Sequence, residues 1–180
     1  LALGVAGAIA VDAASVTADP SILAAGDCAE AMHAVTGAPT WVPLALRANR
    51  AGKLAGSTAL GERREAPPIV GTAVFKFFDL AVARSGLTES EARAAGFDPV
   101  SAVVKTGATA HYYRHRAPLL VQLIADRGTR RLLGGSLVGP IASAHRIDTL
   151  AALLHGRATV DALYDMDLAY APPFGPSWSP

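Results

Sequence analysis

The sequence of 180 residues lacks several features that would assign a function directly. It has a single cysteine, Cys28, so it can form neither an internal disulfide nor a redox pair of thiols. It has no Gly-x-Gly-x-x-Gly segment, which excludes the usual phosphate loop of a dinucleotide site. His33, His145 and His155 show no spacing typical of metal ligands, so we expect no metal site.

Net charge and long apolar runs are also scarce. A net charge of +1 gives no basis for binding nucleic acid or an anionic membrane. Residues 1–11 are almost all small or apolar, but this run is too short to cross a bilayer and no basic segment precedes it. We therefore expect a cytoplasmic protein without a membrane anchor, and a chain that starts in the middle of a domain.

An apolar run over residues 22–25 ends abruptly in Gly26 and Asp27. The pattern favours a buried parallel strand with Asp27 beyond its carboxyl end, which is where α/β sheets bind ligands. A carboxylate there can accept hydrogen bonds from ribose or ribityl hydroxyls, and a glycine lets ligand and backbone approach closely. An ordinary exit from a strand into a turn fits the same residues about equally well.

A helix is expected over residues 44–60, with Pro43 opening it. Small residues at spacings of three and four form a ridge along it that can lie close to a strand or a flat ligand: Ala45, Ala48, Gly52, Ala55 and Ala59. Its first turn supplies free N–H groups and the positive end of the helix dipole. Residues 61–68 are charged and contain two prolines, so we place a domain boundary between residues 1–66 and 67–180.

The second part is expected to be an α+β domain on a mainly antiparallel sheet. Residues 72–83 favour one long, largely buried strand, and residues 100–105 favour another. Residues 118–125 and 132–138 flank the turn sequence Asp-Arg-Gly-Thr and favour an antiparallel hairpin.

Helices are expected at three places in this second part. Thr88 and Glu91 form a capping box that starts a short helix. Apolar residues at helical spacing indicate a helix over residues 143–155, within which Arg146 and Asp148 would form or cap structure. A last short helix begins at Thr159, and the proline-rich tail after it is expected to be irregular.

Five segments taken together resemble one known family over nearly the whole chain. They are Gly26-Asp27-Cys28-Ala29-Glu30, the helix from Pro43, Phe75-Lys76-Phe77-Phe78-Asp79, Arg146-Ile147-Asp148 and Tyr170-Ala171-Pro172-Pro173-Phe174. Their order and spacing resemble the C-terminal half of flavin-dependent pyridine nucleotide-disulfide oxidoreductases, in the branch of coenzyme A-disulfide reductases and NADH oxidases. The resemblance implies that residues 1–66 are the returning α/β piece of an FAD-binding domain and residues 67–180 most of a dimerisation domain, with both ends cut.

The resemblance also implies roles for individual residues. Gly26 and Asp27 match the residues beside the ribityl chain of FAD, and Pro43, Leu44 and Ala45 match the helix start that faces the pyrimidine edge of the flavin. Tyr112 or Tyr113, together with Tyr170, match tyrosines that the partner subunit brings to the redox-active sulfur. A phenol at that place can donate a hydrogen bond to a thiolate.

Two further features are interpreted through this resemblance. Cys28 lies at the flavin-side strand exit and is expected to be structural, because the family's redox cysteine lies near the start of the full protein. Arg114, His115 and Arg116 either meet coenzyme A phosphates or form a solvated loop.

Three functional hypotheses follow. In the first, the parent is a homodimeric FAD enzyme that passes hydride from NAD(P)H to the flavin, and from there electrons through a cysteine to coenzyme A disulfide, another small disulfide or oxygen. In the second, the chain is an isolated dimerisation module with no activity of its own. In the third, the parent is a reductase that passes electrons to a ferredoxin-type partner.

Overall fold

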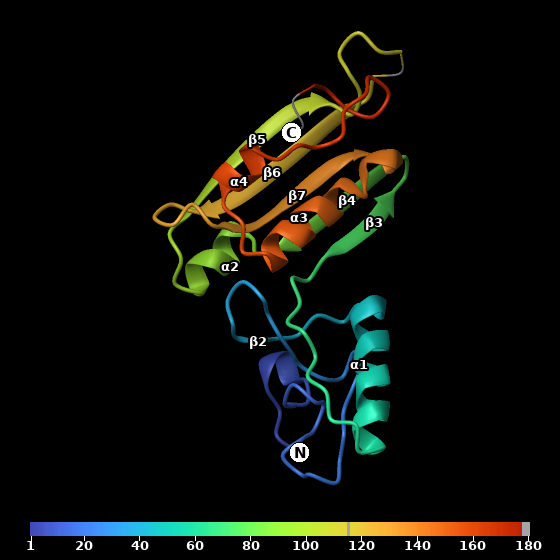
Figure 1. Cartoon of the computed structure of the whole chain (residues 1–180), viewed down its shortest axis with the longest axis vertical. Coiled ribbons are helices and arrows are strands. Elements are labelled where there is room, and N and C mark those ends of the chain that lie inside the picture. Colours follow the sequence, from blue (N-terminus) through green and yellow to red (C-terminus); the bar gives the residue numbers. More distant parts are fainter. Residues whose placement is uncertain (115, 178–180) are drawn as a thin grey trace. The chain divides into compact units, whose positions relative to one another are not determined.

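The computed structural model describes residues 1–114 and 116–177. It divides the chain into two compact units, Leu1–Ile69, here called the N-terminal unit, and Val70–Pro180, called the sheet unit. The division falls after Ile69, whereas the sequence placed it after residue 66. Figure 1 labels the elements of both units, which are described separately.

The N-terminal unit contains one long helix, α1 (Ala45–Ala59), as expected from the sequence. Its remaining elements are short: η1 (Val5–Gly7), β1 (Ala31–Met32) and β2 (Pro39–Thr40). β1 and β2 pair antiparallel. None of the residues of α1 is buried, and a Cβ atom added at Gly52 would meet no atom within 4 Å, so the ridge of small side chains stays open along part of its length.

The buried parallel strand expected over residues 22–25 does not form. Leu23 instead makes an isolated antiparallel bridge with Val16, and Ile22 is 40% exposed. The turn at Asp19 folds this segment back, so that the Thr17 N–H donates to the Ile22 carbonyl at 3.0 Å. A buried parallel strand needs neighbouring strands on both edges and cover on both faces. Residues 1–69 supply neither, so local turn bonds take the place of a sheet.

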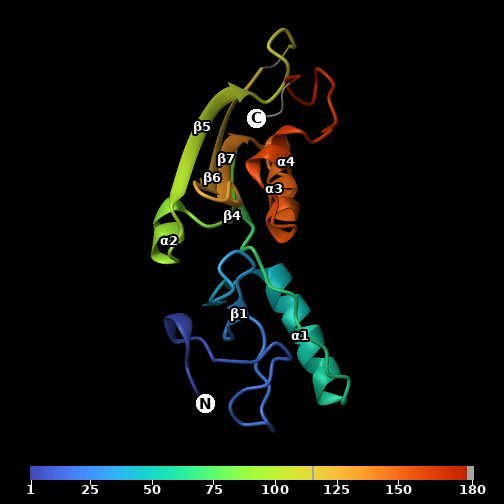
Figure 2. The same ribbon diagram turned by 60° about the vertical axis from the view of Figure 1, so that its left-hand side comes forward.

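The sheet unit is an α+β fold on a five-stranded antiparallel sheet of order β3-β4-β7-β6-β5, which confirms the predicted fold class. The strands are β3 (Ala73–Phe77), β4 (Leu80–Gly86), β5 (Pro99–Gly107), β6 (Pro118–Asp126) and β7 (Leu132–Pro140). The helices are α2 (Glu89–Ala94), η2 (Ile141–Ser143), α3 (Arg146–His155) and α4 (Val160–Tyr164). Figure 2 shows α3 and α4 on one face of the sheet.

Two local predictions hold in the sheet unit. β6 and β7 form the expected hairpin, with Leu120 opposite Val138. Thr88 caps α2 through its hydroxyl, which accepts the Glu91 N–H at 3.2 Å, while the Glu91 carboxylate accepts the Thr88 N–H at 2.7 Å. Both features follow from short-range sequence chemistry.

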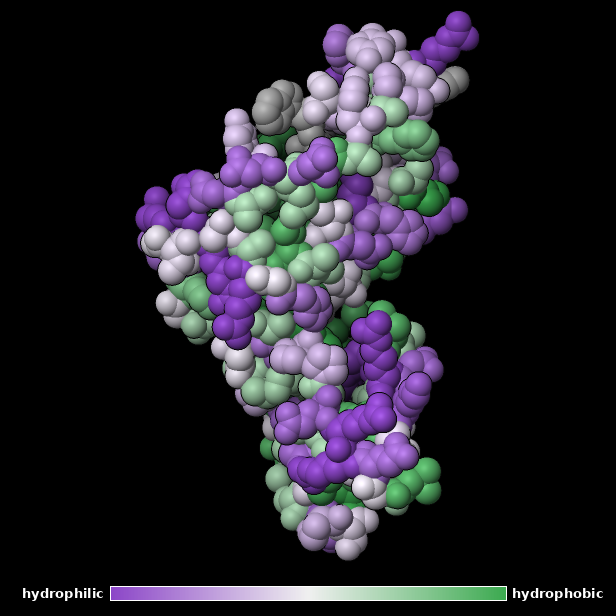
Figure 3. All heavy atoms as spheres, viewed as in Figure 1, coloured by the Kyte–Doolittle hydropathy of each residue, from purple (hydrophilic) through white to green (hydrophobic). Residues whose placement is uncertain are grey.

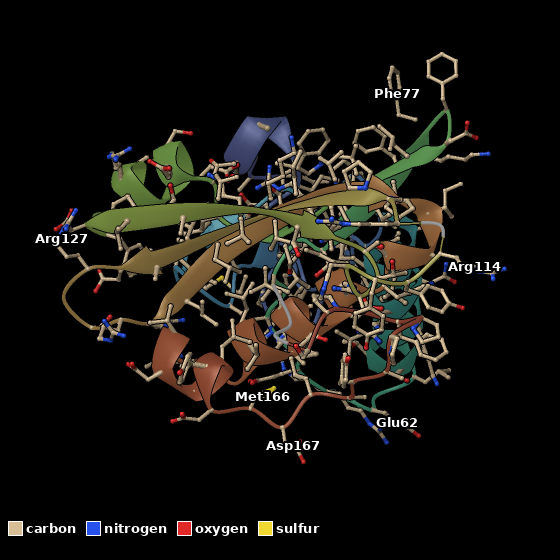
Figure 4. The ribbon with its side chains drawn as sticks, turned by 90° about the horizontal axis from the view of Figure 1, so that it is seen from above. Glu62, Phe77, Arg114, Arg127, Met166 and Asp167 are labelled. Carbon is tan, nitrogen blue, oxygen red and sulfur yellow. The ribbon has the colours of Figure 1, made fainter. Side chains whose placement is uncertain are left out.

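The single long strand expected over residues 72–83 is wrong, because the chain reverses at Phe78 and Asp79 to form the β3–β4 hairpin. Phe78 takes up a left-handed conformation with φ of 50°. β3 is an edge strand, and Phe77 is 58% exposed and points away from the sheet in Figure 4. A continuous apolar run hides such a turn, since no glycine or proline marks it.

The core of the sheet unit lies between α3 and strands β4 and β7. Leu132, Leu133 and Leu154 are fully buried there. Gly134 in β7 lies so close to Leu87 that a Cβ atom would overlap the Leu87 backbone nitrogen and oxygen. Close backbone approach at β7 therefore sets how tightly β4 and α3 can pack.

The surface in Figure 3 mixes hydrophobic residues with hydrophilic ones over each unit. Among residues 1–114 and 116–177, no helix combines the length and the apolar composition needed to cross a membrane.

Gly134→Ala is expected to destabilise the sheet unit by about 1–3 kcal/mol, because the added methyl group must push the backbone of Leu87 away from β7. Urea unfolding of the chain followed by circular dichroism measures the change. Gly128→Ala in the β6–β7 turn is the control, since its Cβ would meet only the Asp126 carboxylate, at 3.8 Å. Equal stability of the two variants would contradict the expectation.

Candidate functional site

Two exposed tyrosines from distant parts of the sequence meet in the sheet unit. The hydroxyls of Tyr112 and Tyr170 lie 3.1 Å apart and share a hydrogen bond. Tyr112 belongs to the loop between β5 and β6, and Tyr170 to the C-terminal segment after α4. These two segments lie side by side in both Figure 1 and Figure 2. Tyr112 is 65% exposed and Tyr170 48% exposed, so the pair is accessible to a ligand.

The hydrogen bond with Tyr112 raises the pKa of Tyr170 above its ordinary value. A phenol with a raised pKa keeps its proton at neutral pH, so the pair can donate an O–H group to an acceptor placed over it. The His111 ring packs edge-on against Tyr112 with a centroid separation of 5.1 Å, which supports the orientation of that ring.

Tyr113 does not join this pair. Its backbone N–H donates to the Ala110 carbonyl at 2.9 Å, while the hydroxyl that reaches Tyr170 is that of Tyr112. The sequence left Tyr112 and Tyr113 as alternatives, and the geometry brings only Tyr112 to Tyr170.

Main-chain contacts hold the two tyrosine-bearing segments together. The Ala110 N–H donates to the Pro172 carbonyl at 3.0 Å. The Arg146 guanidinium donates to the carbonyls of Ala108 and Phe174, one from each segment. Arg146 therefore reaches outward from α3, contrary to the expectation that it acts within its own helix. Asp148 instead bonds to His145, at 3.1 Å between carboxylate oxygen and Nδ1.

The predicted flavin-side residues gather in the N-terminal unit. Gly26 has φ of 86°, and a Cβ there would meet no atom within 4 Å, so its open side faces free space. Asp27 is exposed, and its backbone carbonyl accepts the Trp41 Nε1–H at 2.7 Å. Within the described residues its carboxylate accepts no hydrogen bond, so both oxygens are available to a ligand.

The start of α1 differs by one position from the sequence expectation. Leu44 is the N-cap and makes no side-chain cap bond, while Ala45 is the first helical residue. Pro43 therefore precedes the cap instead of occupying the first turn. A first turn without a side-chain cap leaves its N–H groups free to bind an acceptor.

Arg47 connects the two groups of flavin-side residues and was missed from the sequence. Its guanidinium donates to the carbonyls of Gly26 and Glu30, which fixes the 26–30 turn beside the first turn of α1. Burial lowers the pKa of Arg47, and the nearby Asp27 charge opposes that effect. No motif in the sequence marks this contact, because Arg47 bonds to main-chain carbonyls of a segment about twenty residues earlier in the chain.

A domain family described as the pyridine nucleotide-disulphide oxidoreductase dimerisation domain matches residues 72–179. The chain belongs to the pyridine nucleotide-disulphide oxidoreductases. The match covers the whole five-stranded sheet together with Tyr112 and Tyr170.

Known oxidoreductases of this family are similar to nearly the whole chain. The NAD(P)H coenzyme A polysulfide/persulfide reductase of Pyrococcus horikoshii is 41% identical over 99% of this chain and 40% of its own length. A solved NAD-dependent persulfide reductase from A. fulgidus has a TM-score of 0.92 at 38% identity, covering 100% of this chain and 34% of that one. The coenzyme A disulfide reductase of Staphylococcus aureus is 33% identical over 86% of this chain and 35% of its own length. The chain therefore spans between 34% and 40% of the length of these three oxidoreductases.

Cys28 and the basic cluster were the remaining candidates from the sequence. Among the described residues, no group of three or more His, Cys, Asp or Glu side chains is placed to hold a metal ion. Cys28 is exposed, and its thiol donates to the Ala25 carbonyl at 3.3 Å. Of the basic cluster, Arg114 points outward in Figure 4, and His115 lies outside the described residues.

Arg47→Ala is expected to loosen the 26–30 turn, because two main-chain carbonyls lose a charged donor. Hydrogen bonds to charged groups contribute roughly 1.5–3 kcal/mol, so the Ala29 and Glu30 amides should exchange at least about tenfold faster. Hydrogen exchange by NMR measures this. Arg50→Ala, an exposed position on the same helix, is the control. Unchanged protection in Arg47→Ala would refute the role of this contact.

Proposed function

We propose that this chain is part of a cytoplasmic, homodimeric flavoenzyme that uses NAD(P)H to reduce a disulfide or persulfide linked to coenzyme A. The names of the relatives support this substrate class, since two of them name coenzyme A and the third names a persulfide. The match to a dimerisation domain supports the homodimer.

The hydrogen-bonded pair of Tyr112 and Tyr170 is the observation that carries the proposal. Reducing a disulfide or persulfide cleaves a sulfur–sulfur bond, and the departing sulfur gains negative charge as the bond breaks. Two phenols joined by one hydrogen bond still have one O–H group left to donate, and the hydrogen bond with Tyr112 raises the pKa of Tyr170, which favours its protonated form. The pair can therefore donate a hydrogen bond to the departing sulfur as negative charge develops on it.

Several features of the N-terminal unit support a role for it in an FAD pocket. The Asp27 carboxylate would accept hydrogen bonds from ribityl hydroxyls, and Gly26 leaves open space for the ligand beside it. The uncapped first turn at Leu44 and Ala45 would donate N–H groups toward an electron-rich ring edge. When bound, FAD accepts hydride from the nicotinamide and supplies reducing equivalents for the thiol chemistry.

Tyr170→Phe in the complete reductase is expected to slow disulfide reduction by roughly tenfold to a hundredfold, the effect of losing one hydrogen bond to a charged group. The rate of flavin reduction by NAD(P)H should stay unchanged. Stopped-flow absorbance separates the two half-reactions. Tyr112→Phe should behave like Tyr170→Phe, while Tyr113→Phe should retain wild-type rates. Equal slowing of both half-reactions would reject the assigned role.

Asp27→Asn in the complete reductase is expected to weaken FAD binding by roughly tenfold to a hundredfold, because an amide is a weaker acceptor than a carboxylate. Equilibrium dialysis against FAD, read from flavin absorbance, measures the affinity. Glu62→Gln, which removes an exposed carboxylate after α1, should leave it unchanged. Full FAD affinity in Asp27→Asn would exclude this residue from the pocket.

A further inference from the structure

Arg146 lies at the first position of α3 and connects two segments that the sequence separates widely. Its Nη2 atom donates to the Ala108 carbonyl at 3.0 Å, at the start of the loop that carries Tyr112. The same atom donates to the Phe174 carbonyl, in the segment that carries Tyr170. One side chain from the rigid helix thus holds both segments.

The bonding pattern of Arg146 differs from that of other arginines in the sheet unit. Arg130 pairs with Asp161 and Arg127 with Asp98, both on the surface. Arg146 is half-buried, and within the described residues it pairs with no carboxylate. Burial lowers its pKa, but a guanidinium stays charged at neutral pH. Its charge is therefore directed at main-chain carbonyls, and the two N–H groups of Nη2 lie in fixed directions in the guanidinium plane, so each can hold one acceptor.

Up to residue 177, few hydrogen bonds connect the C-terminal segment to the rest of the sheet unit. Met166 and Asp167 are exposed and lie on the outward side of this segment in Figure 4, and Phe174 is 77% exposed. Fixing the backbone of one residue costs about 1–2 kcal/mol in conformational entropy. A segment that buries so little apolar surface needs hydrogen bonds to stay ordered. Arg146 supplies one to Phe174, four residues beyond Tyr170, in addition to the main-chain bond at Pro172.

We propose that Arg146 is a positioning residue, which sets the alignment of Tyr112 with Tyr170 by fixing the loop after β5 against the C-terminal segment. The proposal rests on the proposed function, in which this pair donates to the departing sulfur. Proton donation depends steeply on alignment, and a displacement of about 1 Å can cost roughly a hundredfold in rate. Arg146 touches neither hydroxyl and acts only through the backbone on either side of them.

The kinetic test uses Arg146→Ala in the complete reductase. Disulfide reduction is expected to slow at least tenfold, while the rate of flavin reduction and the KM for NAD(P)H stay at wild-type values. Adding Tyr170→Phe should cause no further loss beyond that of Tyr170→Phe alone, because both changes disable the same pair. Arg130→Ala, which breaks a structural ion pair of the same unit, should leave both half-reactions unchanged. Independent, multiplying losses in the double variant would overturn the proposal.

The second test needs no turnover. In the 180-residue chain labelled with ¹³C-tyrosine, NMR titration should show the pKa of Tyr170 falling toward its ordinary value in Arg146→Ala, as it should in Tyr112→Phe. Arg130→Ala should retain the raised value. If Arg146→Ala fails to fold, Arg146→Met decides, since methionine keeps an apolar stem but has no N–H group for the Ala108 and Phe174 carbonyls, and it should lower the Tyr170 pKa in the same direction. An unchanged Tyr170 pKa in the folded variant would overturn the proposal.

The two tests separate the failure of this proposal from failure of the proposed function. If Tyr170→Phe slows disulfide reduction but Arg146→Ala changes neither rate nor titration, the tyrosine pair is functional and the proposal for Arg146 is wrong. If Arg146→Ala lowers the Tyr170 pKa while Tyr170→Phe leaves turnover unchanged, the contact is real and the proposed function of the pair is wrong. That second result also overturns Arg146 as a positioning residue for the reaction.

Discussion

Close approach of β7 to its neighbours is the constraint on which the sheet unit depends. Gly134 admits the Leu87 backbone, and Gly139 admits the Leu119 side chain, whose Cδ1 would lie 2.6 Å from an added Cβ. This close packing fixes the end of β7, from which the chain passes through η2 into α3. The first residue of α3 is Arg146, so this packing helps to place the start of the helix that carries its guanidinium.

The N-terminal unit is organised by different forces. It lacks an extended sheet, and hydrogen bonds from side chains to the main chain hold its segments together instead. Asp12 accepts the N–H groups of Ala14 and Val16 and pairs with Arg63, while Arg47 holds the 26–30 turn. Such contacts are directional, and they place polar groups accurately without a large apolar core. None of the residues of α1 is buried, so directional contacts of this kind matter more to this unit than apolar packing along the helix.

Short-range signals allowed much of the fold to be predicted. The Thr88 capping box, the β6–β7 turn and the helical spacing of α3 each depend on residues a few positions apart. The incorrect predictions concern segments whose structure depends on residues distant in the sequence or on a turn that no typical turn residue marks. The run around Phe78 contains a turn formed without glycine or proline, and residues 22–25 read as a buried strand although no neighbouring strand within residues 1–69 pairs with them. At the site, similarity to known sequences pointed to the tyrosines, but only three-dimensional contacts separated Tyr112 from Tyr113. Arg47 was missed, and Arg146 was expected to act only within its own helix, because the partners of both are main-chain carbonyls, which carry no sequence signature.

The use of phenols rather than an imidazole has a physical consequence for the proposed chemistry. An imidazole loses its proton near neutral pH, so its ability to donate varies across the physiological range. The pair formed by Tyr112 and Tyr170 raises the Tyr170 pKa further from that range, and its donor stays in place throughout it. A phenol with a raised pKa is a weak acid, so it has little tendency to transfer its proton to the leaving sulfur. Its contribution must therefore come from the alignment of its O–H group with the sulfur rather than from its acidity. Alignment in turn is set by the backbone contacts of two exposed segments, and this is why a guanidinium that never touches sulfur can matter for breaking the sulfur–sulfur bond.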